Sequence, residues 1–158
     1  MTQSILLDVG YHGLLGVVAT LGFAIWFNVP KDALARVAAV GSLGYITRRT
    51  FVDLHFSPAS SSFWAALCIG LVGYFIARRN DEPRFILSIP GIIPLVPGIP
   101  AYNALVSFFD GDISKGLENA VRATMIIGAL AAGLIGARMV TMRRLSEEPI
   151  VFGFGRSR

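Results

Sequence analysis

Five long apolar runs, separated by short charged segments, fill most of this 158-residue chain. The runs are Gly13 to Val29, Ala33 to Phe51, Ser60 to Ala77, Phe85 to Phe109 and Asn119 to Val140. A helix needs about 20 mostly apolar residues to cross a bilayer, and each run approaches that length. Only 15% of the residues are charged, against about 25% in soluble domains. We therefore predict an all-α, polytopic integral membrane protein with four to five transmembrane helices, forming one transmembrane domain over residues 1–158, with a loose C-terminal tail at 146–158.

Three of the runs need separate comment. No Lys or Arg precedes the first run and no small-residue cleavage site follows Phe27, so we expect a retained span rather than a signal peptide. The second run carries Arg36 and ends at two arginines, so it either spans the bilayer or only re-enters it. The fourth run contains several helix breakers, which no continuous helix tolerates, so we expect a broken fourth helix. These breakers are Pro90, Gly91, Pro94, Pro97, Gly98 and Pro100.

The basic residues lie between the apolar runs, and they predict an orientation. The net charge is +4 and the isoelectric point is about 9.7. Cytoplasmic loops of membrane proteins carry an excess of Lys and Arg. With the C-terminus inside, ten basic residues are cytoplasmic and four are outside. The ten are Lys31, Arg36, Arg78, Arg79, Arg84, Arg138, Arg143, Arg144, Arg156 and Arg158, and the four are Arg48, Arg49, Lys115 and Arg122. We expect a cytoplasmic C-terminus, and no binding of nucleic acid.

The stretch Ser88 to Leu105 is where we expect a ligand. Proline frees a carbonyl one turn earlier, and polar backbone inside a membrane needs protein, water or a ligand as partner. In transporters, the N-terminus of such a half-helix can hold a substrate carboxylate. A half-helix beginning near Pro100 would point the N–H groups of Ala101, Tyr102 and Asn103 toward the membrane centre. The alternative is a kinked or re-entrant packing element without a ligand.

Other polar residues near the apolar runs have two interpretations each. Asn28, before Pro30, is expected to cap the second helix, or it lies near a substrate path. Arg36, Arg122 and Arg138 either extend to lipid headgroups or face the bundle interior. In the second case Arg36 and Arg122 are the better counter-ions for an anionic substrate.

The sequence has no signature of an enzyme, a metal site or a cofactor. Cys68 is the single cysteine, His12 and His55 are far apart, and no carboxylate lies inside an apolar run. Small residues recur at spacing four in the last run, where they predict close helix packing. The pairs are Gly128 with Ala132, Ala129 with Gly133, Ala132 with Gly136, and Gly133 with Ala137.

Three segments of the chain carry a resemblance to a known family. They read GFAIWFNVP at Gly22 to Pro30, GSLGYITR at Gly41 to Arg48, and IPGIIPLVPGIPAY at Ile89 to Tyr102. In these segments the sequence resembles the threonine/serine exporter (ThrE) family, more closely its small YjjB-like subunit. The resemblance implies a bacterial inner-membrane secondary exporter in which a larger, YjjP-like multi-span subunit is the partner. It also implies a small carboxylate substrate and coupling to the proton-motive force.

We therefore expect a subunit of a two-component exporter of threonine and serine, or of a succinate-like dicarboxylate. Its expected partner is the larger subunit, and the alternative is a homo-oligomer. The alternative is a non-transporting assembly or scaffold subunit. The expected substrate pathway comprises Asn28, Arg36, Pro97, Gly98, Pro100, Ala101, Tyr102, Asn103 and Arg122, with Pro90, Gly91 and Pro94 as the helix break. We expect no catalytic residue, no metal ligand and no cofactor.

Overall fold

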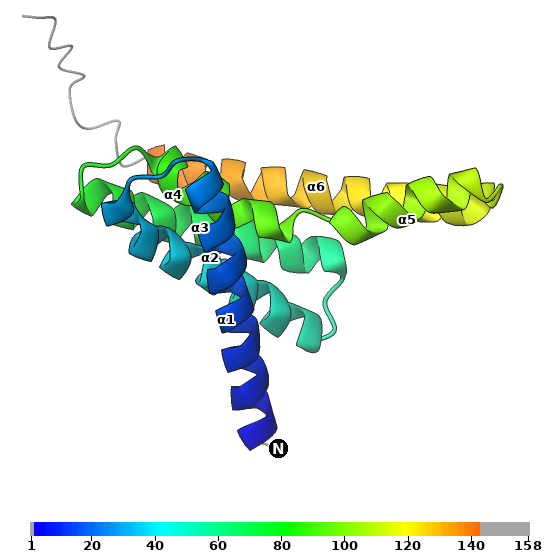
Figure 1. Cartoon of the computed structure of the whole chain (residues 1–158), viewed down its shortest axis with the longest axis horizontal. Helices are drawn as coiled ribbons and strands as arrows, with labels where there is room; N and C mark the ends of the chain where they lie inside the picture. Colours follow the sequence, from blue (N-terminus) through cyan, green and yellow to red (C-terminus); the bar gives the residue numbers. More distant parts are fainter. Residues whose placement is uncertain (1, 143–158) are drawn as a thin grey trace, which may run out of the picture.

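The computed structural model of the chain describes residues 2–142, with side chains from residue 10 onward. This part of the chain folds into six α-helices and one short 3-10 turn (Figure 1). The elements are α1 (Thr2–Trp26), α2 (Lys31–Asp53), α3 (Pro58–Arg79), α4 (Arg84–Ile92), the turn η1 (Ile93–Leu95), α5 (Gly98–Phe109) and α6 (Ile113–Met142). The prediction of an all-α fold is confirmed, as is the break in the fourth apolar run. The tail expected at 146–158 lies outside the described residues.

The helices differ in their suitability to cross a membrane. By length and hydropathy, α3 and α6 are long and apolar enough to span, and α4 with α5 would form a third span bent by 45°. The segment Gly10–Trp26 of α1 is apolar but shorter. Helix α2 does not qualify, because its two ends carry charged residues, such as Lys31 and Arg49, and its apolar centre is brief. Two to three spans of the predicted four to five therefore have support.

Helix α3 lies at the centre of the packing, antiparallel to α2 and parallel to α6. Helices α3 and α6 make the most extensive contact, α1 pairs with α2, and α2 packs against both α3 and α4. Helix α5 packs mainly against α6, and these two project beyond the other helices (Figure 1). In the same view, α1 runs at a steep angle to the long axis of α6. The core at the centre consists of small and branched apolar side chains. It is formed by Val40, Ala65, Ala66, Ile69, Leu95, Ile126 and Leu130.

The end of α1 shows that Asn28 has a different role from the cap predicted for it. Asn28 has a positive φ of 54°, and its N–H donates to the carbonyl of Ile25 at 3.0 Å. The next N–H, of Val29, donates to the carbonyl of Ala24 at 3.0 Å. This pair of hydrogen bonds is a Schellman motif, which closes the C-terminus of α1. The predicted cap is wrong, because Pro30 occupies the N-cap position of α2 and Asn28 is used to end the preceding helix.

Three further helices end in the same left-handed conformation. His55 follows α2 with φ 63°, Asp81 follows α3 with φ 52°, and Gly111 follows α5 with φ 80°. Glycine adopts this conformation without a steric penalty, whereas an L side chain brings its Cβ close to the following carbonyl. His55 and Asp81 therefore hold a strained backbone at two of the turns.

The glycines of α6 are not equivalent. A methyl group added at Gly133 would lie 2.5 Å from the carbonyl oxygen of Phe63 and 2.8 Å from the Cβ of Ala66, both on α3. Likewise, a methyl group at Gly70 of α3 would lie 2.5 Å from the Cβ of Ala137. The predicted close packing is confirmed for Gly133 and Ala137, which are buried. It is wrong for Gly128, because that glycine points into open space.

Candidate functional site

The break in the fourth apolar run is a short irregular segment between two helices. Helix α4 runs into the turn Ile93–Leu95, and the chain then extends at Val96 (φ −61°, ψ 135°) before α5 begins at Gly98. The N–H of Val96 donates to the carbonyl of Ile93 at 3.0 Å, and the N–H of Gly98 donates to the carbonyl of Val96 at 2.8 Å. These bonds close the turn locally and leave α4 and α5 at an angle of 45°.

Two prolines remove backbone donors from this segment. Pro90 lies inside α4 and cannot donate to the carbonyl of Ile86, and Pro94 cannot donate to the carbonyl of Pro90. Both carbonyls therefore lack the donor that a regular helix would supply. A carbonyl in this condition is available to a side chain, a water molecule or a ligand.

The second half-helix begins earlier than the sequence predicts. Helix α5 starts at Gly98 rather than near Pro100, because Pro97 occupies the N-cap position and a proline is tolerated in the first turn. The N–H of Ala101 donates to the carbonyl of Pro97 at 3.2 Å. It is therefore engaged in the helix, and the prediction that the N–H groups from Ala101 onward point freely at a ligand is wrong.

The break is packed tightly against α2. A methyl group added at Gly91 would lie 3.6 Å from the backbone N and Cα of Gly41, so the two chains approach through glycine. On its other side, Gly41 contacts the side chain of Thr20 in α1. The Thr20 hydroxyl is fully buried and has no hydrogen-bond partner among the described residues. Three elements thus meet at small residues around one unsatisfied polar group.

A cavity of about 400 Å³ lies between the α1–α2 turn and α4. It is lined on one side by Phe27, Asn28 and Pro30 and on the other by Ile86 and Pro90. The structure therefore brings together one predicted pathway residue, Asn28, and one residue of the predicted break, Pro90. Ile86, whose carbonyl lacks its helical donor, is one of the residues that line this cavity.

Tyr102 and Asn103 lie apart from this cavity, on the exposed side of α5. The side chain of Tyr102 is 67% exposed, and Asn103 is exposed as well. Within the described part of the chain, the Asn103 amide makes no side-chain hydrogen bond. Its surroundings on α5 are apolar, because Ile99 and Val106, on the same face of the helix, are also exposed. The pair faces away from the other helices of this chain.

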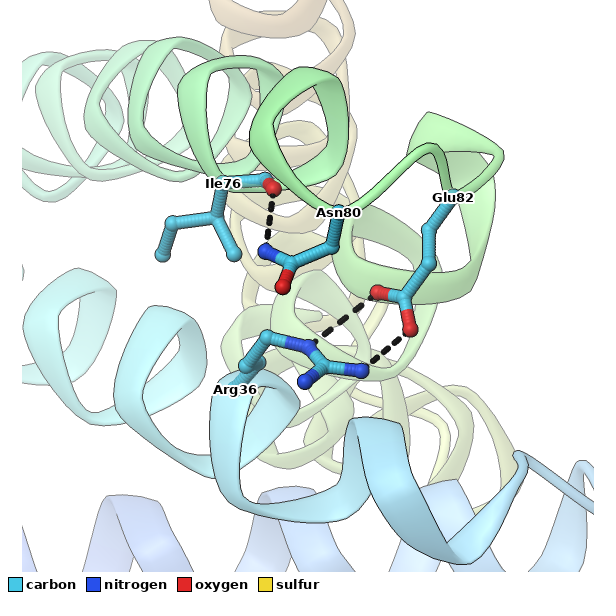
Figure 2. Close-up of polar contacts among 4 residues, drawn as sticks. All are labelled: Arg36, Ile76, Asn80 and Glu82. Atoms are coloured by element: carbon cyan, nitrogen blue, oxygen red, sulfur yellow. Dashed lines mark hydrogen bonds and ion pairs between the residues drawn. The ribbon is translucent and has the colours of Figure 1, made fainter.

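The two arginines predicted as counter-ions also lie apart from each other. Arg36 forms a bidentate ion pair with Glu82 of the α3–α4 loop, with Nε 3.2 Å from one carboxylate oxygen (Figure 2). In the same view, the Asn80 amide donates to the carbonyl of Ile76 at 2.7 Å. Arg36 therefore ties the start of α2 to the loop between α3 and α4. Arg122 lies in the N-terminal part of α6, where it lines a pocket of about 220 Å³ together with the start of α3.

The structure reveals a basic cluster that the sequence analysis does not single out. The Arg84 guanidinium lies 4.2 Å from the centre of the Tyr74 ring and donates to the Thr141 hydroxyl at 3.2 Å. Arg78 donates to the Tyr74 hydroxyl at 3.2 Å. Only the spacing of Tyr74 and Arg78, four residues apart on one helix, is readable from sequence. The approach of Arg84 to Thr141 depends on the packing of α4 against α6.

A local ion pair between Asp112 and Lys115 precedes the apolar part of α6. Lys115 donates its backbone N–H to the Asp112 carboxylate at 3.1 Å and places its Nζ 2.8 Å from the other oxygen. These hydrogen bonds hold the pKa of Asp112 below its ordinary value, and Asp112 caps α6. Between residues 2 and 142 no group of three His, Cys, Asp or Glu side chains is arranged to hold a metal ion.

Comparison with known proteins gives a consistent result. The family described as "Threonine/Serine exporter, ThrE" matches residues 12–140. An uncharacterized protein of Haemophilus influenzae is 28% identical over 149 residues, an alignment that covers 89% of this chain and 49% of the relative. The chain thus spans about half the length of this curated relative. No solved structure matches. The family description names threonine and serine, and it gives no support to export of dicarboxylates.

Proposed function

The chain belongs to the threonine/serine exporter family, and from this we propose that it is one membrane half of a secondary exporter of small hydroxy amino acids. Membership of the family suggests a subunit of an export transporter rather than an enzyme. We further propose that threonine or serine is the substrate, that the proton-motive force drives export across the bacterial inner membrane, and that the C-terminus is cytoplasmic. The broken segment from α4 to α5 forms part of the pathway.

The observation that carries this proposal is the polar pair on the outer face of α5. Transfer of an unpaired amide from water into hydrocarbon is unfavourable by roughly 2–7 kcal/mol. Asn103 has no partner within the described chain, and it sits beside exposed apolar residues. A polar side chain in such a place is explained if a second protein half and the substrate path face it. Tyr102, one residue earlier, adds a hydroxyl on the same half-helix.

The partner half is proposed from size and from surface. The Haemophilus relative has about as much additional chain as this protein has in total, because the alignment covers 49% of it. A second half of that size is sufficient for several more membrane helices. In the proposed complex it covers the outer face of α5 and contributes the polar and charged groups that a zwitterionic amino acid needs. The role of the larger subunit is therefore to complete the site.

The break supplies the movement in this mechanism. Helix α5 packs mainly on α6, and Gly98 at its start has no neighbouring atom within 4 Å of an added methyl group. The turn before it is held by two local hydrogen bonds rather than by a continuous helical ladder. A change of angle at this point reorients Tyr102 and Asn103 while α4 stays packed against Gly41. Alternating access by rocking of half-helices is a known use of such breaks.

Inverted membrane vesicles test the proposal, because export in the cell becomes uptake into the vesicle. Labelled threonine, serine and succinate would be supplied to vesicles that contain this chain and its partner, with and without a proton gradient. We expect gradient-driven uptake of threonine or serine. Asn103→Ala should lower the rate at least tenfold at equal protein, because its amide faces the substrate path, and Tyr102→Phe should lower it less.

Leu105→Ala is the matched control for the Asn103 variant. Leu105 is exposed on the same half-helix, two residues later and roughly 200° around the axis, so it lies away from Asn103. Its variant should transport at close to the rate of the unchanged protein. Loss of complex yield in the Asn103 variant, with a normal rate per complex, would instead favour the scaffold function.

A further inference from the structure

A second groove lies between α4 and α6, and it shares Phe85 and Ile89 with the cavity beside Asn28. Its volume is about 480 Å³. Arg84, Arg138 and Thr141 lie at one end, Ile89 and Leu134 lie along its length, and Gly70 of α3 forms part of its floor. Among the described residues, those that line it include two arginines and no Asp or Glu. The groove is therefore positive at one end and apolar along the rest.

Arg84 is held in place at the positive end. Its guanidinium stacks over the Tyr74 ring, and one of its nitrogens donates to Thr141. The Thr141 hydroxyl in turn donates to carbonyls of α6, at 3.0 Å to that of Ala137. A guanidinium carries five N–H donors in a fixed plane, so several remain to face an anion. Arg138 lies three residues before Thr141 on α6 and is exposed at the same end of the groove.

The apolar part of the groove runs from this end toward the middle of the helices. Leu134 precedes Thr141 by seven residues on α6, which corresponds to about 10 Å of helix. Ile89 follows Arg84 by five residues on α4, so about 7 Å of α4 forms the opposite side of the groove. Phe85 and Ile89 are exposed along the rim, so the groove opens sideways, toward the surroundings of the helices.

We propose that this groove binds an anionic phospholipid, with its phosphate between Arg84 and Arg138 and the start of an acyl chain along Ile89 and Leu134. The positive end matches a phosphate, and the apolar length matches a hydrocarbon chain. A small hydrophilic amino acid satisfies only the first of these features. The site does not include Tyr102 or Asn103 of the proposed substrate path, and it lies at the end of the helices where the chain's own basic residues gather.

Thermal unfolding of the purified full chain in detergent, titrated with phosphatidylglycerol, measures the binding, and native mass spectrometry counts the lipid retained. We expect phosphatidylglycerol to raise the unfolding temperature, and phosphatidylcholine to raise it less. Arg138→Gln should weaken the apparent affinity for phosphatidylglycerol roughly fivefold. This variant carries the test because Arg138 is exposed, whereas Arg84→Gln also removes the contacts with Tyr74 and Thr141.

Arg79→Gln is the matched control. Arg79 is exposed at the same end of the helices but does not line the groove, so its variant removes one charge and leaves the site intact. We expect its affinity to stay within twofold of that of the unchanged chain. Equal affinities of the Arg138 and Arg79 variants would overturn the proposal. So would binding of inorganic phosphate or of the free headgroup glycerophosphoglycerol as tight as that of the diacyl lipid, or displacement of the lipid by threonine.

Discussion

The approach of α6 to α3 at Gly133 predicts a large difference between two identical substitutions on one helix. Gly133→Ala places a methyl group 2.5 Å from the Phe63 carbonyl oxygen and 3.0 Å from the Leu67 nitrogen, both backbone atoms of α3. These atoms cannot rotate away, so the two helices must separate by roughly 1 Å to restore ordinary contact distances. Gly128→Ala, five residues earlier, meets nothing within 4 Å.

The magnitudes of the two effects follow from opposing terms. Overpacking of a tight contact destabilises by about 1–3 kcal/mol, and replacement of Gly by Ala in a helix stabilises by about 1 kcal/mol. Gly133→Ala is therefore expected to be destabilising by about 1 kcal/mol. Gly128→Ala keeps only the second term and is expected to be stabilising by up to about 1 kcal/mol. The two variants should differ by about 2 kcal/mol.

The assay is unfolding of the purified chain in mixed detergent micelles with increasing dodecyl sulfate, followed by tryptophan fluorescence (Trp26 on α1 and Trp64 on α3) and by circular dichroism. The midpoint should fall for the Gly133 variant and rise or stay constant for the Gly128 variant. Equal midpoints for the two variants would refute the reasoning, because they would mean that α6 does not approach α3 through Gly133.

Three further predictions concern single residues. Thr20→Val should stabilise the chain by about 1 kcal/mol, because it removes a buried hydroxyl without a partner and preserves its shape; a loss of stability in the same unfolding assay would show that the hydroxyl is satisfied. Glu82→Gln should lower stability by about 1–2 kcal/mol, because the half-buried Arg36 loses its charged partner, and a double-mutant cycle with Arg36→Gln should recover part of that loss. His55→Gly should raise the unfolding midpoint, by about 0.5–1 kcal/mol in free energy, because glycine accepts the positive φ at the end of α2; an unchanged or lower midpoint would contradict this.

The helices of this chain could be predicted because their apolar runs and their breaks are local features. The run Ser60 to Ala77 becomes α3 with only two residues added at each end, and the breaker-rich run divides where its prolines predict. Helix α6 begins six residues before its apolar run, at Ile113, because Asp112 caps it ahead of the apolar part. Local sequence rules therefore predict which segments form helices better than they predict where each helix begins.

The candidate site could be predicted only in part, because its geometry depends on contacts between distant residues. Nothing in the local sequence indicates that Arg36 pairs with Glu82, or that Arg84 reaches Thr141. The residue type of Asn28 and its position before Pro30 predict a cap of α2, but the competing Schellman motif at the end of α1 takes precedence. Tyr102 and Asn103 lie where the breaker motif suggested, on α5, but they face outward, which only the packed structure reveals.

Transport by the separate and combined halves tests the central claim most directly. Inverted vesicles would be prepared from cells that make this chain alone, the larger subunit alone, or both, with the amount of each protein measured. The account predicts that a proton gradient drives uptake of labelled threonine or serine only when both halves are present. Uptake that is the same without this chain, or no uptake of threonine and serine with both halves shown to be in the membrane, would contradict it.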